Sequence, residues 1–236
     1  MNGGAFGKAF AGGLVAAIAG LVASLLAGLF ICATNAGMYV WAMERAGVYE
    51  TAGVDGETLT AVAGDVARYI GARVPADFDR VIVMDGLERP ALNERELTHM
   101  KDVRQLLKLA GNVAGWFCAA CAIAVVITAR MKARRAAGLG MMAGAGVMLI
   151  CALAVLIAIR VSFYNFFVAL HERLFANDLW YMNPETDLLI RMMPDDFYIS
   201  MGAAIGAAWA VVVIATCAAG LLLIITDGRR EARRAV

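Results

Sequence analysis

The stretch Phe163–Phe197, FYNFFVALHERLFANDLWYMNPETDLLIRMMPDDF, lies between two long apolar runs in the second half of the chain. It contains His171, one of only two histidines among the 236 residues. The other, His99, lies in a second polar segment, Asn93–Val103, which reads NERELTHMKDV. Histidine titrates near neutrality and is the side chain most often used for proton transfer. We therefore interpret the two polar segments as parts of a single site.

The composition is that of a membrane protein. Hydrophobic residues make up 61% of the chain, whereas soluble domains contain roughly 45–50%, and the mean hydropathy is +0.71. The net charge of +1 gives no indication of a nucleic-acid partner. Four runs are long enough to cross a bilayer, which requires about 20 apolar residues. They are Ala9–Cys32, Leu109–Ala129, Ala136–Ile159 and Met201–Thr226.

The first run is predicted to be an uncleaved membrane helix. The apolar region of a signal peptide is only about 7–15 residues long, and Ala9–Cys32 is longer. Leu29–Cys32 faintly resembles a lipoprotein cleavage motif, but the bulky Ile31 before the cysteine argues against cleavage.

Basic residues set the expected orientation, because they concentrate in cytoplasmic loops. They are Lys8, then Arg130, Lys132, Arg134 and Arg135 between the second and third runs, then Arg229, Arg230, Arg233 and Arg234 in the tail. We therefore expect both termini in the cytoplasm and two outer loops, at about 34–108 and 160–200. The predicted fold is an all-α membrane protein with one domain, 1–236: a four-transmembrane-helix bundle with a small extracytoplasmic cap.

Small residues recur at every fourth position in three of the runs, which allows helix backbones to approach closely in lipid. The rows are Gly20, Ser24 and Gly28; Gly140 and Gly144; and Gly202 and Gly206. The cysteines also lie in or at the ends of the runs: Cys32, Cys118, Cys121, Cys151 and Cys217. We interpret them as small packing residues, and the C-x-x-C spacing within the second run as coincidental.

The outer loops are expected to contain helices. Asp55–Arg73 has the apolar period of an amphipathic helix, and Asp79–Asp85 is expected to be an extended segment. Asn93 followed by Glu96 forms a capping box, which predicts one helix from Glu94 into the second run. Asn183–Pro184 predicts the start of a short helix that ends at about Met193.

The two histidines are predicted to lie at a similar height above the membrane. His99 lies ten residues before Leu109, and His171 lies twelve residues after Ile159. If both helices continue beyond the bilayer, these separations correspond to roughly 15 Å and 18 Å. Asp102 lies one turn beyond His99, where a carboxylate can orient an imidazole.

Other kinds of chemistry have weaker support. The chain contains no G-x-S-x-G motif and no cysteine near either histidine. A metal set of His99, Asp102, His171 and Glu172 lacks the tight spacing of zinc motifs such as H-E-x-x-H, so no metal is expected. The residues alone therefore indicate a histidine pair at the level of the lipid headgroups.

The two polar segments resemble the signatures of a bacterial membrane family, the lipoprotein intramolecular transacylases. The first signature is carried by Asn93, Glu96, His99, Met100, Asp102 and Val103. The second is carried by Phe163, Phe166, Phe167, His171, Phe175, Asn177, Asp178, Trp180, Pro184, Asp187 and Pro194. Leu170 departs from the pattern, since an aromatic residue is expected there.

The resemblance implies an acyl migration within one molecule. The substrate is a diacylated lipoprotein in the bacterial cytoplasmic membrane, and the site faces outward. The sn-2 acyl chain moves from the diacylglyceryl group to the α-amino group of the N-terminal cysteine, which gives the lyso-form lipoprotein. No cofactor is implied; the partners are the lipoprotein and membrane lipid.

Roles for the site residues follow from this chemistry as hypotheses. One of His99 and His171 removes the amine proton, and the other protonates the glycerol oxygen or stabilises the oxyanion. Asp102 orients His99. Arg173, Asn177 and Trp180 contact the oxyanion or glycerol, and Asp187 supports the site as part of the second signature. Two alternatives are a non-catalytic membrane protein that binds lipid or a partner, and a metal-dependent lipid hydrolase.

Overall fold

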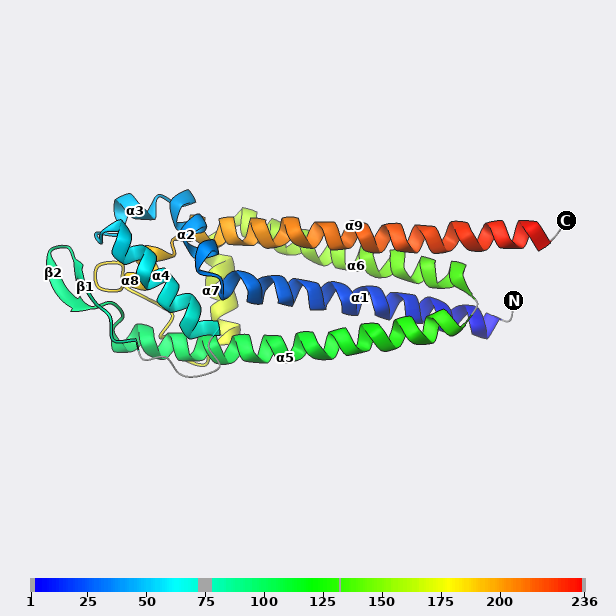
Figure 1. Ribbon diagram of the computed structural model, residues 1–236, viewed down its shortest axis with the longest axis horizontal. Coiled ribbons are helices and arrows are strands. Elements are labelled where there is room, and N and C mark those ends of the chain that lie inside the picture. The colour runs from blue at the N-terminus through cyan, green and yellow to red at the C-terminus, as the bar shows by residue number, and fades with distance from the viewer. Residues whose placement is uncertain (1–2, 72–77, 132, 235–236) are drawn as a thin grey trace. The chain divides into compact units, whose positions relative to one another are not determined.

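The computed structural model describes residues 3–71, 78–131 and 133–234, with side chains to residue 228 (Figure 1). Of the predicted features, Lys132 and the last two residues of the helix at Asp55–Arg73 lie outside the described residues, as do the side chains of the arginine tail. Backbone contacts divide the chain into two compact units. Unit 1 comprises Met1–Gly28, Gly111–Ala158 and Gly206–Val236, and unit 2 comprises Leu29–Ala110 and Ile159–Ile205.

Four long helices confirm the predicted spans. They are α1 (Gly3–Ala33), α5 (Glu94–Arg130), α6 (Arg134–Val161) and α9 (Asp195–Arg234). Each is long and apolar enough to cross a membrane. The helix that begins at Glu94 continues without a break into the second apolar run, as the capping box predicts.

Glycines allow the closest helix contacts within unit 1. A Cβ at Gly13 would meet the carbonyl of Ala137, and a Cβ at Gly140 would meet the carbonyl of Phe10. The indole of Trp209 donates to the carbonyl of Leu21 at 2.9 Å, which satisfies a polar group inside the bundle. The row of small residues in α9 behaves differently, because nothing among the described residues lies within 4 Å of a Cβ at Gly206.

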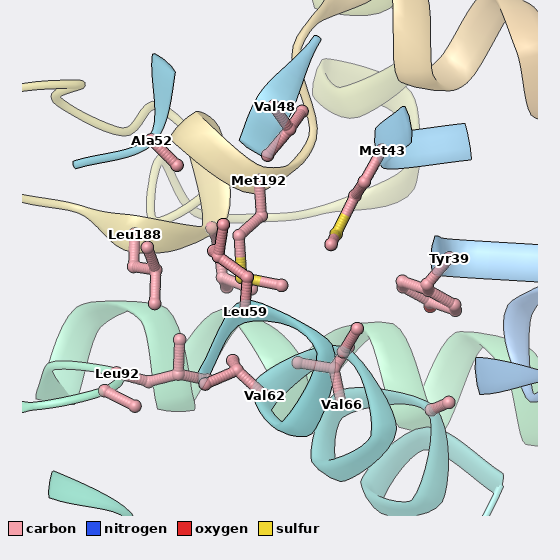
Figure 2. Packing of buried hydrophobic residues seen from close by; sticks show 14 of the residues in the cluster. Tyr39, Met43, Val48, Ala52, Leu59, Val62, Val66, Leu92, Leu188 and Met192 are labelled. Atoms are coloured by element: carbon pink, nitrogen blue, oxygen red, sulfur yellow. The ribbon is translucent and has the colours of Figure 1, made fainter. Parts of the chain in front are cut away.

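Unit 2 has its own apolar core. Its helices outside the long four are α2 (Ala36–Arg45), α3 (Val48–Thr51), α4 (Gly56–Gly71), α7 (Phe163–Leu174) and α8 (Leu188–Met192). Figure 2 shows Leu59, Val62 and Val66 of α4 packed with side chains from the other elements of this cluster. The amphipathic helix predicted at Asp55–Arg73 is thus confirmed over its described length, with its apolar face in the core.

The extended segment at Asp79–Asp85 is one strand of a hairpin. Strand β1 (Val81–Met84) pairs antiparallel with β2 (Leu87–Pro90), the one sheet among the described residues. Asp85 and Gly86 connect them with φ of 51° and 82°, the positive values that a tight two-residue turn requires. An ion pair of 2.9 Å between Asp85 and Arg191 ties the turn to the end of α8.

The third span does not continue to His171, contrary to the height estimate. Helix α6 ends at Val161, and Ser162 has an extended backbone with φ −162° and ψ 106°. Its hydroxyl accepts a hydrogen bond from the amide of Asn165 at 3.2 Å and so caps a separate helix, α7. His171 therefore lies on its own short helix, and a continuous rise from the span does not give its height.

The helix predicted from Asn183 to about Met193 is shorter than expected. The backbone forms a turn over residues 184–186, and the helix itself begins at Leu188. The carboxylate of Asp187 accepts a hydrogen bond from the amide of Asn183 at 2.9 Å, which closes the turn before the helix starts.

Glu96 joins the two outer loops of the predicted topology. Its amide and carboxylate form the expected capping box with Asn93, at 3.0 Å and 2.8 Å. The second carboxylate oxygen accepts the amide of Leu189 in α8 at 2.8 Å. Because Glu96 is fully buried, both hydrogen bonds lie in a region of low dielectric, where charge-assisted bonds are strong.

Replacing Gly140 with alanine is expected to lower the free energy of unfolding by about 1–3 kcal/mol, because the new methyl group overlaps the carbonyl of Phe10. Gly146→Ala, on the same helix, is the matched control, since a Cβ there meets nothing within 4 Å. The control should be neutral or stabilising by up to about 1 kcal/mol. Unfolding in detergent would measure both, and equal effects would contradict close packing at Gly140.

Glu96→Ala is expected to lower the free energy of unfolding by about 3–5 kcal/mol. The substitution leaves two amides, those of Asn93 and Leu189, without their charged acceptor. Glu94→Ala on the exposed first turn of α5 is the control and should cost less than about 1 kcal/mol. Thermal unfolding in detergent measures both losses of stability. If Glu94→Ala lowers the free energy of unfolding as much as Glu96→Ala does, the buried carboxylate contributes nothing to stability.

Candidate active site

The structure brings the two histidines together within unit 2. His99 comes from α5 and His171 from α7, and their ring centroids are 6.2 Å apart with an interplanar angle of 34°. The two polar segments therefore meet, as the sequence predicted, although they are separated by two membrane spans along the chain.

Aromatic rings surround the imidazole pair. Phe175 lies beside both histidines, with centroids 5.0 Å from His99 and 5.5 Å from His171. Phe167 lies 3.9 Å from His171 and Trp180 lies 5.1 Å from it. These rings limit the access of water to the pair and strengthen electrostatic interactions there.

His171 is held in one orientation by its own helix. Its Nδ1 lies 2.8 Å from the carbonyl of Phe167, one turn earlier. A carbonyl only accepts, so this contact assigns the hydrogen of a neutral ring to Nδ1 and leaves Nε2 free to accept a proton. Burial lowers the pKa of His171 below its usual value, and the hydrogen bond to Phe167 opposes that shift only in part.

His99 is more deeply enclosed, with 8% of its surface exposed. Its Nδ1 is buried and has no hydrogen-bond partner among the described residues. Burial disfavours a positive charge on an imidazole, and a second imidazole nearby adds to this effect. A buried polar atom without a partner costs free energy, so this nitrogen is suited to meet a polar atom of a ligand.

Both histidines line one cavity of about 320 Å³. All of its lining residues belong to unit 2, and most are apolar side chains from α1, α5, α7, α8 and α9. The volume lies at the lower end of the range of about 300–1,000 Å³ for small-molecule pockets. An apolar cavity with a few polar groups is the usual form of a site for a largely hydrocarbon ligand.

Asp102, predicted to orient His99, forms a different contact. Its carboxylate accepts a hydrogen bond from the side-chain amide of Asn177 at 2.9 Å. The oxygen of the Asn177 side chain in turn accepts the amide of Leu179 at 3.2 Å. The pair thus fixes the backbone just before Trp180, so both residues act on the shape of the site.

Arg173 and Asp187 have structural contacts. Arg173 is exposed and donates to the carbonyl of Ala169 on its own helix at 2.9 Å. Asp187 is buried and accepts hydrogen bonds from Asn93, Asn183 and Thr186. Burial alone would raise the pKa of the Asp187 carboxyl, but these hydrogen bonds outweigh it, and its pKa lies below the usual value.

The segment between α7 and α8, Phe175–Asp187, is held against the start of α5 and is called the strap below. Arg95 donates to the carbonyls of Asp178 and Leu179 at 2.6 Å and 3.3 Å. Arg89 donates to the carbonyl of Thr186 at 2.5 Å. Neither these contacts nor the bond from Glu96 to α8 is predicted from the sequence. For Glu96 the capping box is the available signal.

No group of three or more His, Cys, Asp or Glu side chains suitable for a metal occurs in the described part of the chain. Of the four donors considered from the sequence, Asp102 is bound to Asn177 and Glu172 is exposed.

Comparison with solved structures shows the fold. The chain matches a structure of the membrane-integral lipoprotein intramolecular transacylase Lit from Bacillus cereus with 17% identity and a TM-score of 0.69, covering 95% of this chain and 97% of that chain. A variant of that protein with a histidine-to-alanine mutation matches with 17% identity, 92% and 94% coverage and a TM-score of 0.72. A histidine-to-arginine variant matches with 16% identity, 95% and 93% coverage and a TM-score of 0.65.

A search of curated protein sequences gave no significant match. The family model described as "Lipoprotein intramolecular transacylase Lit" matches residues 14–198, which is most of the chain and includes both histidines. The chain therefore belongs to the lipoprotein intramolecular transacylase family.

Proposed function

We propose that this protein transfers the sn-2 acyl chain of a diacylglyceryl-modified lipoprotein to the α-amino group of the same N-terminal cysteine. The observation that carries the proposal is the histidine pair at an apolar cavity, with His99 buried and His171 partly buried, in a chain of the transacylase family. The cavity suits an acyl chain, and the imidazoles supply proton transfer where the ester and amine meet.

The free Nε2 of His171 is the better candidate for the base. An α-amino group has a pKa of about 7.7–8.0, so much of it is protonated near neutral pH and a base is needed to release the nucleophile. The amine attacks the ester carbonyl, the bond from that carbon to the sn-2 oxygen breaks, and an amide bond forms. The proton of the ammonium form passes through the base to solvent. The proton that nitrogen loses on forming the amide goes to the glycerol oxygen, so the neutral product has the same mass as the neutral substrate.

His99 is proposed to serve the leaving oxygen or the oxyanion. A nitrogen of its ring, which lies beside His171, is suited to donate a hydrogen bond as negative charge develops on the tetrahedral intermediate. Because donor ester and acceptor amine belong to one molecule, the site needs mainly to hold them in contact, and such positioning contributes much of the rate in intramolecular reactions.

The proposed setting is the outer face of the bacterial cytoplasmic membrane. The basic residues favour cytoplasmic termini, which places unit 2, with both histidines, in an extracytoplasmic cap of a single membrane domain. The partners are then the diacylated lipoprotein and the surrounding lipid, and Asp102, Asn177, Trp180 and Asp187 shape the site. No cofactor is required by this chemistry.

Mass spectrometry of the N-terminal peptide of one lipoprotein tests the proposal, in cells that make diacylated lipoproteins with and without this protein. The expected product has an unchanged mass, with fragments of an N-acyl, S-monoacylglyceryl cysteine. Loss of one acyl chain would instead identify a hydrolase. An unaltered diacylglyceryl peptide, with the protein confirmed in the membrane, would support lipid or partner binding without catalysis.

His99→Ala and His171→Ala are each expected to reduce transacylation at least about 100-fold, because proton transfer by a positioned side chain typically contributes about 10²–10⁴-fold. Lys101→Ala, exposed on the same helix as His99, is the control and should keep full activity. The same fragmentation assay measures all three. Full activity in both histidine variants would refute the two-histidine site.

The activity is expected to fall at acid pH as His171 becomes protonated. Burial lowers the pKa of His171, so its neutral form persists below the usual value of about 6.5. Trp180→Ala should expose the imidazole of His171, raise the pKa of His171 and move the acid limb of the kcat/KM profile to higher pH. Tyr181→Ala, at an exposed neighbouring position, should leave the pKa and the profile unchanged. NMR titration of the ring gives the same comparison without activity; an unmoved pKa would count against burial as the cause.

A further inference from the structure

The cavity extends along α5, away from the histidines. On this helix its lining includes His99, Val103 and Leu107. Leu107 lies eight residues after His99, which corresponds to about 12 Å along the helix axis. The cavity therefore extends about 12 Å along α5 from His99, and its lining on this side is aliphatic.

Helix α9 and the last turns of α1 contribute to the same aliphatic end. Met201 and Ile205 follow Phe197 along α9, and Leu29 and Cys32 come from α1. Met201 and Leu107 are buried, with 9% and 7% of their surfaces exposed, and both belong to the apolar core of unit 2. The side chains of Leu107 and Met201 are therefore packed on this side of the cavity, whereas Leu29 is 42% exposed.

This shape fits one end of an ester-linked hydrocarbon chain. Apolar cavities accept apolar ligands, and the buried Nδ1 of His99, which has no partner among the described residues, offers a polar contact beside the aliphatic side chains. A carbonyl or an amine near the histidines would therefore direct its attached chain toward Leu107.

We infer that the wall formed by Leu107 and Met201 selects the length of the migrating acyl chain. The inference rests on the proposed function and deepens it by assigning specificity residues. A lipid tail gains little from leaving the bilayer for an apolar cavity, since both surroundings are apolar. Selection must then come from fit: a longer chain meets the packed wall, and a shorter chain leaves part of the cavity unfilled.

The test uses the full-length protein in detergent and a mixture of synthetic diacylglyceryl lipopeptides with free N-terminal amines. The peptides share one sn-1 chain and differ only in the length of the sn-2 chain. Mass spectrometry reads the N-acylated product of each length from a single reaction, so the ratio of long to short product is independent of the amount of active protein.

Leu107→Trp is expected to lower the ratio of long to short product by about tenfold, because the larger side chain displaces about two methylene groups of the longer acyl chain from the cavity. Leu107→Ala and Met201→Ala should raise the ratio, because they lengthen the cavity. Leu109→Trp is the matched control: it is exposed, lies on the same helix two residues away and does not line the cavity. Its ratio should equal that of the unmodified protein.

The outcomes separate the inference from the function on which it rests. An unmodified protein that transfers no chain of any length would refute the proposed function. Transfer with ratios that none of the Leu107 and Met201 variants change would refute chain-length selection alone. Equal loss of all lengths in Leu107→Trp, with unchanged ratios in both alanine variants, would mean that this wall only stabilises the fold.

Discussion

The site depends on one buried carboxylate. Glu96 accepts the amide of Asn93 with one oxygen and the amide of Leu189 with the other, so it fixes the residue that precedes α5 and the first turn of α8 at once. His99 follows Glu96 by less than one turn, so its position is set by the same contact. Removing a charge from water is costly, and the paired amides offset that cost only when both segments are in place.

The surroundings of the two histidines determine their protonation state. Aromatic rings and burial keep the imidazoles of His99 and His171 close together and disfavour their positive charge. In the proposed reaction a neutral imidazole accepts the proton that the amine loses, and passing that proton to the glycerol oxygen returns the pair to its neutral state. The cavity is lined by the same side chains, so in the proposed reaction proton transfer and the binding of hydrocarbon share a single space.

Much of this could be predicted where the signal is local. Hydropathy gave the spans, the capping box gave the start of α5, and the scarcity of histidine indicated the site. Two further features have local signals in the sequence. Ser162 is a helix-capping residue and separates α7 from α6. The Asp85-Gly86 pair is a turn sequence and forms the hairpin. The bonds of Asp102 to Asn177 and of Arg95 to the strap join residues distant in sequence, and no periodicity or spacing encodes such contacts.

The way in which the strap is held has a consequence for sequence variation. Arg95 binds the backbone carbonyls of Asp178 and Leu179, and Arg89 binds that of Thr186. A carbonyl is present whatever the side chain, so the bonds to Asp178 and Leu179 do not depend on which residues stand there, whereas the Thr186 hydroxyl also donates to Asp187. The two arginines therefore hold the backbone of the strap, while Phe175, Asn177, Trp180 and Asp187 of the same segment act through their side chains.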